Sequence, residues 1–394
     1  MEIRKITSEE KKLYNRLSDY AFGEWKDKEI EDEKLKWMNV EHCLVLEEDG
    51  KMVSGLINHR LKQSVRGVVK AMSGIGNVAT YPEYRNKGYV KALFKQTFQD
   101  CLENDLPVSS LQPFKETFYR KFGYVATNRE IMFKFGGAAI AHYLNFTTDD
   151  NWQVERSNSA QAQQEFVDFI SKEALKYNGM VIYDELYPGW REHLFQDDLI
   201  LLVKYKGEVK AGCRYVKKDQ NIRMNDVRWT DITSRKLFFQ YFARHRDQIG
   251  SFTMPISMGV NFYNWFQDNN KEYEIKMSEG AWMVRVVDVI SAFKDIRISG
   301  KDKLTYEVTD EMCEWNNGIF QLAAVNGKAV MEKVDANVTA DFKADIRGMS
   351  ALLYGAMPVE EIIDRGWLEV FDVEKQGILE SWFPVEIFFN SFWF

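Results

Sequence analysis

The first 140 residues alternate between segments with the period of a helix and segments with the period of a strand. An amphipathic stretch over residues 8–22 predicts a helix, and its acidic start, Ser8-Glu9-Glu10, suits the helix dipole. Residues 42–46 and 52–56 predict a hairpin around a turn at Glu48-Asp49-Gly50. The same criteria predict strands over about residues 73–80 and 107–111, and helices over about residues 88–103 and 115–122. A boundary is predicted near residue 140, because the composition changes after Gly136-Gly137.

The second segment partly repeats the first. The stretch Gly50-Lys51-Met52-Val53-Ser54-Gly55 has a counterpart in Gly207-Glu208-Val209-Lys210-Ala211-Gly212, and both follow an apolar strand. Strand, turn and strand form a common unit, so this match alone does not establish a duplication. A helix-like stretch over residues 160–177 also precedes the second hairpin, as one precedes the first, which favours a diverged repeat.

A third segment begins near Gly280. Residues 283–289 are rich in β-branched side chains and predict a strand that opens this segment, with a helix after it. Asn326-Gly327 separates two further strands and is a strong hairpin signal. The last eight residues, 387–394, are mostly aromatic. Chain ends are normally polar and frayed, so the sequence predicts that this end is buried.

Composition narrows the class of protein. A length of 394 residues corresponds to two or three domains at about 150 residues each. Apolar residues make up 45% and charged residues 28%, which excludes disordered and collagen-like classes. The net charge of −7 argues against a general affinity for nucleic acid or an anionic membrane.

The four cysteines are spread along the chain without metal-ligand or disulfide spacing, so we expect buried free thiols and no metal site. The charged start, Met1-Glu2-Ile3-Arg4-Lys5, lacks the apolar core of a signal peptide. No apolar run approaches the roughly 20 residues that span a bilayer. These features predict a soluble cytoplasmic protein.

Residues 77–90 carry the strongest chemical signal. They pass from a strand through a turn at Pro82 to Arg85-Asn86-Lys87-Gly88 and then into an amphipathic helix. A helix N-terminus offers unpaired N–H groups and a positive dipole end, while Gly88 allows close approach and Arg85 and Lys87 add charge. The pattern predicts a phosphate site, although a basic turn before an ordinary helix would look similar.

A second glycine pattern lies just upstream. Gly74-Ile75-Gly76-Asn77-Val78-Ala79 fits G-x-G-x-x-A, the dinucleotide fingerprint. That fingerprint must open a helix, whereas Pro82 and the β-branched Val78 and Thr80 indicate a strand here. We therefore reject a dinucleotide site.

The loop resembles the acyl-CoA pyrophosphate loop of the GCN5-related N-acetyltransferases, whose pattern is R/Q-x-x-G-x-G/A. Val90 stands where the family has Gly or Ala. The resemblance implies acetyl-CoA as donor, and an acyl-CoA N-acyltransferase fold of the α/β (α+β) class. It implies that the pantetheine arm pairs with the strand edge Val78, Ala79 and Thr80, and that the pyrophosphate is bound by Arg85, Asn86, Lys87, Gly88, Tyr89 and Val90.

Residues 118–124 resemble the F-Y-x-x-x-G-F/Y signature of the same family. By that resemblance Tyr119 is the general acid that protonates the leaving CoA thiolate. A phenol with a pKa near ~10 is protonated at neutral pH and can donate to a thiolate of comparable basicity. On residue chemistry alone, Tyr119 would be one of several aromatic side chains on an apolar helix face.

The whole chain resembles the Eis (enhanced intracellular survival) family in its length, its repeated hairpin, the stretch 285–289 and its aromatic end. The resemblance implies three domains: a catalytic acetyltransferase domain at 1–140, a degenerate second copy at 141–281 and a sterol-carrier-protein-like α+β domain at 282–394. It also implies that the carboxylate of Phe394 acts as the catalytic base. The alternative is that the tail is only the last strand of the third domain.

These features predict an acetyl-CoA-dependent N-acetyltransferase in which a primary amine attacks the thioester directly. The resemblance implies small-molecule or peptide acceptors, such as aminoglycosides or lysine side chains, and a homo-hexamer. One alternative is a non-catalytic protein that binds acyl-CoA or a lipid; another is a tRNA-dependent transferase, which the lack of a basic bias disfavours. Glu24-Trp25 and Glu31-Asp32-Glu33 could line an acceptor cleft, although such charge runs are more often a solvated helix face.

Overall fold

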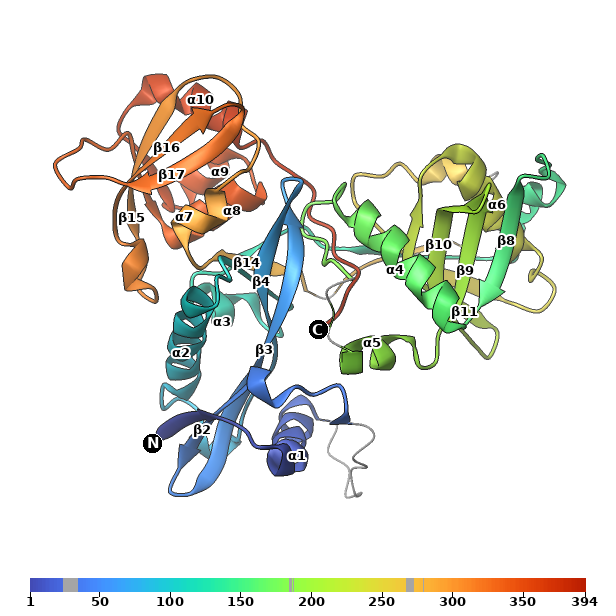
Figure 1. Cartoon of the computed structure of the whole chain (residues 1–394), viewed down its shortest axis with the longest axis horizontal. Coiled ribbons are helices and arrows are strands. Elements are labelled where there is room, and N and C mark those ends of the chain that lie inside the picture. Colours follow the sequence, from blue (N-terminus) through green and yellow to red (C-terminus); the bar gives the residue numbers. More distant parts are fainter. Residues whose placement is uncertain (24–34, 184–185, 187, 267–272, 279) are drawn as a thin grey trace.

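Three β-sheets organise the chain in the computed structural model, which describes residues 1–23, 35–183, 186, 188–266, 273–278 and 280–394 (Figure 1). Two of the sheets have seven strands and the third has five. Glu24-Trp25 and Glu31-Asp32-Glu33 lie outside the described residues.

The first sheet has the strand order β1-β2-β3-β4-β5-β14-β6. Its strands are β1 (Glu2–Lys5), β2 (Cys43–Glu48), β3 (Lys51–Val65), β4 (Val68–Thr80), β5 (Val108–Leu111), β14 (Met283–Val286) and β6 (Val125–Ala126). The helices of this part are α1 (Lys11–Phe22), α2 (Tyr89–Glu103) and α3 (Glu116–Arg120). Strands β4 and β5 are parallel, while the other neighbours are antiparallel.

The second sheet repeats this order strand by strand, as β8-β9-β10-β11-β12-β7-β13. Its strands are β8 (Trp152–Ser157), β9 (Leu199–Tyr205), β10 (Glu208–Lys218), β11 (Asn221–Trp229), β12 (Ser251–Ile256), β7 (Ile131–Phe135) and β13 (Glu274–Met277). The helices are α4 (Ala160–Ala174), α5 (Pro188–Phe195) and α6 (Ile232–Ala243). Its parallel pair, β11 with β12, occupies the place of β4 with β5. The shared order confirms the predicted repeat.

The two sheets exchange a strand. Strand β14 was expected to open the third segment, but it pairs with β5 and β6 of the first sheet. Conversely, β7 precedes residue 140 and pairs with β12 and β13 of the second sheet. The expected divisions near residues 140 and 281 therefore do not coincide with the edges of the sheets. The alternation of side chains predicts a strand but carries no information about which sheet receives it.

Both copies also share an irregularity just after the last parallel pairing, in the first strand of each parallel pair. Asn77 in β4 has φ 49° and Asp226 in β11 has φ 54°. The pairing register slips opposite each of them, between Gly55 and Ile57 in β3 and between Gly212 and Arg214 in β10. Asn and Asp tolerate this left-handed conformation better than most residues, so each strand carries a bulge at the same place.

The third part is a five-stranded sheet with the order β17-β16-β15-β18-β19. Its elements are α7 (Val289–Phe293), β15 (Lys303–Thr309), β16 (Gly318–Val325), β17 (Lys328–Lys333), β18 (Phe342–Asp345), α8 (Ile346–Tyr354), α9 (Val359–Asp364), β19 (Leu368–Val370) and α10 (Gln376–Trp382). After α10 the tail leaves this lobe and runs between β3–β4 and α4, so the chain ends between the first two sheets (Figure 1).

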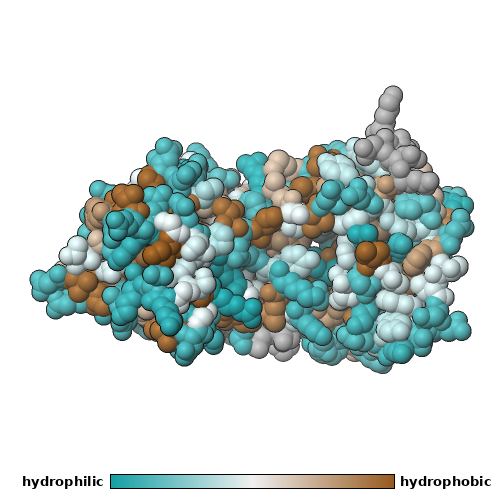
Figure 2. Space-filling model, turned by 90° about the horizontal axis from the view of Figure 1, so that it is seen from above, coloured by the Kyte–Doolittle hydropathy of each residue, from teal (hydrophilic) through white to brown (hydrophobic). Residues whose placement is uncertain are grey.

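The surface is mixed. Figure 2 shows hydrophilic residues interspersed with small hydrophobic clusters over both ends of the molecule. Among the residues that the structure describes, no helix is both long and apolar enough to cross a membrane.

Candidate active site

A pocket of about 770 Å³ opens along the edge of β4 that β5 leaves uncovered. The two strands pair only as far as Ile75 and Leu111, and beyond that point β4 continues to Thr80 paired with β3 alone. Most of the predicted cofactor residues line this pocket: Val78, Thr80, Arg85, Asn86, Gly88, Tyr89 and Val90. Ala79 is buried and, like Lys87, is not among the lining residues. The sequence-derived strand edge and loop thus meet in one cavity.

The loop between β4 and α2 has the geometry of an anion site. Gly88 caps α2 with φ 82°, and Asn86 also has a positive φ of 62°. The first hydrogen bond of this turn runs from Ala92 N to Gly88 O, so the N–H groups before it have no acceptor within the helix. A Cβ built on Gly88 would meet nothing within 4 Å. The residues present therefore fit a diphosphate: there is open space at Gly88, and the positive end of the α2 dipole faces that space.

Lys87 forms an ion pair beside the pocket. Its Nζ lies 3.2 Å from Oε2 of Glu48, at the end of β2, and 4.8 Å from the centroid of the Tyr84 ring. The hydroxyl of Tyr89 donates to Oε1 of the same carboxylate. Glu48 therefore holds the loop after β4 from β2, which is separated from β4 by β3. No local pattern in the sequence indicated this role.

Tyr119 lies in α3 with only 4% of its surface exposed. Its ring packs edge-on against the rings of Phe94, Phe118 and Tyr124, with centroids 5.1 to 6.3 Å apart. Tyr119 itself is not among the residues that line the pocket, although the adjacent Phe118 is. Burial raises the pKa of Tyr119, so the phenol stays protonated across the neutral range. A buried aromatic role and an acid role are both compatible with this position.

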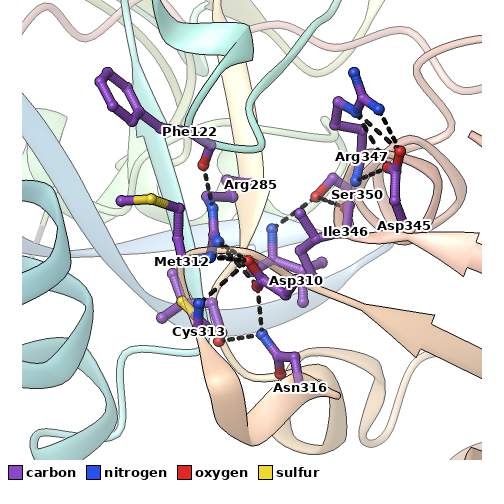
Figure 3. Close-up of polar contacts among 12 residues, drawn as sticks. Phe122, Arg285, Asp310, Met312, Cys313, Asn316, Asp345, Ile346, Arg347 and Ser350 are labelled. Carbon is purple, nitrogen blue, oxygen red and sulfur yellow. Dashed lines mark hydrogen bonds and ion pairs between the residues drawn. The ribbon is translucent and has the colours of Figure 1, made fainter. Parts of the chain in front are cut away.

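The glycine of the same signature, Gly123, makes room for a buried arginine. It has φ 86°, and a Cβ there would lie 2.9 Å from Nε of Arg285. Arg285, in β14, donates from Nε to the carbonyl of Phe122 at 2.6 Å and from Nη2 to both oxygens of Asp310 at 2.8 and 2.9 Å (Figure 3). Arg285 and Asp310 side chains are both fully buried. This pair ties the end of α3 to the third lobe.

The last residue of the chain packs against β4 at two glycines. A Cβ on Gly74 would lie 2.8 Å from the ring of Phe394, and one on Gly76 would lie 3.3 Å from its carboxyl carbon. The two glycines of the rejected G-x-G-x-x-A pattern thus form a seat for the terminal residue. Phe394 therefore lies against Gly76, two residues before Val78, where the predicted pantetheine edge begins.

Histidine and tryptophan side chains surround this end and were not predicted. Nε2 of His59, in β3, also lies 3.3 Å from the Cβ position of Gly76, and its ring is 4.0 Å from that of Trp190 in α5. Burial, with a smaller contribution from His42, lowers the pKa of His59 well below its usual value. Burial likewise lowers the pKa of His42 to about 4. These neutral rings come from distant elements, so no spacing in the sequence could have grouped them.

Two domain families match the sequence. The profile of the acetyltransferase (GNAT) domain matches residues 2–126, and the profile of the sterol carrier protein domain matches residues 289–387. No curated protein matches the chain.

Solved structures share the fold over the whole length. A GCN5-related N-acetyltransferase from Anabaena variabilis ATCC 29413 aligns with a TM-score of 0.86 at 21% identity, covering all of both chains. A probable N-acyltransferase of unknown function from Enterococcus faecalis V583 aligns at 0.83 and 20% identity, covering 100% of this chain and 99% of that one. Eis1 from Mycobacterium abscessus aligns at 0.78 and 14% identity, covering all of both chains. The predicted acyl-CoA N-acyltransferase fold is confirmed.

Proposed function

We propose that this chain, an acetyl-CoA-dependent N-acetyltransferase with a GNAT domain and a sterol carrier protein domain, acetylates primary amines. The observation that carries the proposal is the position of Phe394. Its carboxyl carbon lies against Gly76, next to the strand edge from which Val78 and Thr80 line the pocket. A carboxylate there attracts a cationic acceptor and can take the proton that its nitrogen must lose.

The chain supplies binding and proton transfer. Bound acetyl-CoA supplies the thioester that the amine attacks directly. The first turn of α2 and Arg85 hold its pyrophosphate, and Val78 to Thr80 offer backbone groups to its pantetheine arm. Tyr119 donates a proton to the leaving sulfur, and the carboxylate of Phe394 removes one from the amine, directly or through a water. An α-carboxyl has a pKa near ~3.5 in water, and removal from water makes a carboxylate a stronger base.

The acceptors that we propose are aminoglycosides or lysine side chains, and the proposed assembly is a homo-hexamer. Resemblance to Eis proteins supports both, and sedimentation velocity tests the second. The net charge of −7 is compatible with a cationic acceptor.

The test is release of free thiol from acetyl-CoA with a panel of polyamines, aminoglycosides and lysine peptides. We expect turnover with at least one class. Clear acetyl-CoA binding without turnover on any amine would instead favour a non-catalytic acyl-CoA-binding protein. Appending Gly-Ser after Phe394 tests the base, because the extension moves the carboxylate away from Gly76. Wild-type activity and pH dependence in the extended chain would remove Phe394 from the mechanism.

A further inference from the structure

The tail that delivers Phe394 is held by hydrogen bonds to Asn128 and to residues of the second segment. The side chain of Asn128 accepts from the backbone N–H of Phe388 at 2.7 Å and donates to its carbonyl at 2.8 Å. The backbone N–H of Phe389 donates to the carbonyl of Asn178 at 2.8 Å. The side-chain oxygen of Asn390 accepts from the backbone of Val181 at 3.3 Å. Residues 388–392 are all buried. The last few residues therefore follow a fixed path and are not a frayed end.

The strongest polar contact of the tail is made by Ser391. Its hydroxyl donates to Oδ1 of Asp226 at 2.6 Å. The hydroxyl of Tyr183 donates to the same oxygen at 2.6 Å, and Arg214 donates from Nε to Oδ2 at 2.7 Å. Asp226 is fully buried, and Arg214 compensates its charge. A charged acceptor gives Ser391 a stronger hydrogen bond than a neutral partner would.

Asp226 occupies the bulge of β11 that corresponds to Asn77 in β4. In the first copy the residue before Asn77, Gly76, contacts the carboxyl carbon of Phe394, and the residue after it, Val78, lines the pocket. In the second copy the residue at the same place binds the tail instead. The helix after β11 begins at Asp231 and Ile232, without the Arg-x-x-Gly loop. The second copy has thus kept the bulge and uses it for a different contact.

We propose that the second acetyltransferase-like sheet is a dock that positions the terminal carboxylate, with Asp226 as the positioning residue that holds Ser391. This inference rests on the proposed role of Phe394 as the base. Ser391 is three residues from the chain end, a reach of at most roughly 10 Å. Asp226 fixes Ser391, and Gly74 and Gly76 fix the position of Phe394. The carboxylate at the chain end therefore has little freedom to move. The degenerate copy thereby takes part in the reaction without touching acetyl-CoA.

The test combines Ser391→Ala with the Gly-Ser extension in the full chain. We expect Ser391→Ala alone to lower kcat by roughly tenfold or more, because small misplacements of a reacting group are costly, and to leave the KM for acetyl-CoA unchanged. Asp226 keeps its contacts to Tyr183 and Arg214, so the fold is retained, as the unfolding temperature will show. Ser391→Thr keeps the hydroxyl and should restore activity. Ser381→Ala, on the exposed face of α10, is the matched control and should behave as the parent.

The extended chain separates the outcomes. If Ser391 acts through the carboxylate, Ser391→Ala has no further effect once the extension has moved that carboxylate. The proposal is overturned if Ser391→Ala lowers kcat by the same factor in the extended chain as in the parent. It is also overturned if the extension abolishes activity while Ser391→Ala alone keeps full activity. If the extension itself leaves activity unchanged, the proposed base fails, and the dock fails with it.

Discussion

The carboxyl carbon of Phe394 lies 3.3 Å from the position that a Cβ on Gly76 would occupy. Contacts of this length are too tight for an added methyl group unless the neighbour shifts. Nε2 of His59 lies equally close to that position, and His59 is only 2% exposed. The neighbour that can move is the chain end, so Gly76 sets where the terminal carboxylate sits.

Gly76→Ala should therefore displace the carboxylate and lower kcat by about tenfold or more, with little change in the KM for acetyl-CoA. Steady-state kinetics with acetyl-CoA and the best amine acceptor measures both constants. Gly377→Ala is the matched control, because a Cβ there meets nothing within 4 Å and the site lies in α10. A parent-like kcat in Gly76→Ala would show that the seat does not position the carboxylate.

Gly88→Ala tests the pyrophosphate loop. Space is not the constraint here, since a Cβ would meet nothing within 4 Å, but φ is 82°. An L side chain in that conformation costs about 1–2 kcal/mol, so the loop should relax and the cap of α2 should shift. We expect the KM for acetyl-CoA to rise about tenfold while the KM for the amine changes little. Equal increases in both constants would indicate a general loss of structure.

Tyr119→Phe tests the acid, and Tyr124→Phe is its control. Both changes remove one phenolic hydroxyl from a buried ring in the same aromatic cluster, and the hydroxyl of Tyr124 contacts Ser109 at 2.6 Å. If Tyr119 protonates the thiolate, only Tyr119→Phe should reduce kcat, by about 10²-fold or more, without weakening acetyl-CoA binding. Weaker binding with unchanged kcat would assign Tyr119 to packing alone.

The loop before α2 that lines the pocket could be located from the sequence because its signal is local. Arg85, the glycine three residues later and the helix that follows stand in one uninterrupted stretch, so spacing and geometry coincide. The seat could not be predicted, because Gly74 and Gly76 acquire a reason only when Phe394, more than three hundred residues away, is placed on them. The two glycines of the G-x-G-x-x-A pattern therefore do have a structural role, which is to make room for Phe394 and not to bind a nucleotide.

The exchange of strands between the first two sheets and the bulge in β11 also could not be predicted from the sequence. Residues 283–286 alternate as a strand, and any open sheet edge would satisfy that pattern. In the sequence, Asp226 looks like an ordinary polar residue of a strand. Its left-handed φ and its contacts with Arg214 and Ser391 arise only from tertiary packing. Local patterns predict elements and loops, whereas contacts between distant elements define this site.

Arg285→Met tests the buried pair that joins α3 to the third lobe. The change leaves the carboxylate of Asp310 uncompensated, and losing one partner of a buried pair typically costs about 3–5 kcal/mol. We expect a clearly lower urea midpoint by circular dichroism. Arg285→Met combined with Asp310→Asn removes the lone charge and should recover much of the loss. Equal midpoints for the single and double variants would show that the charge of Asp310 is not the cause.

Glu130 makes stability depend on pH near the tail. Burial raises the pKa of this carboxyl to about 7, although hydrogen bonds from the Trp282 indole at 3.2 Å and the Asn390 backbone oppose the shift. In the unfolded chain a glutamate titrates near ~4.3. The folded state therefore binds an extra proton between those values, and stability falls as the pH rises from about 4.3 through 7.

Glu130→Gln stays neutral and keeps an oxygen for Trp282, so its unfolding temperature should not fall in that window. The variant should match the parent near pH 4 and exceed it at pH 8, as differential scanning calorimetry across the range will measure. Glu103→Gln, at the exposed end of α2, controls for the loss of a carboxylate and should follow the parent curve. Parallel curves for Glu130→Gln and the parent would mean that Glu130 is already ionised in the fold. Trp282 packs on both Trp393 and Phe394, so the same titration should loosen the chain end above pH 7.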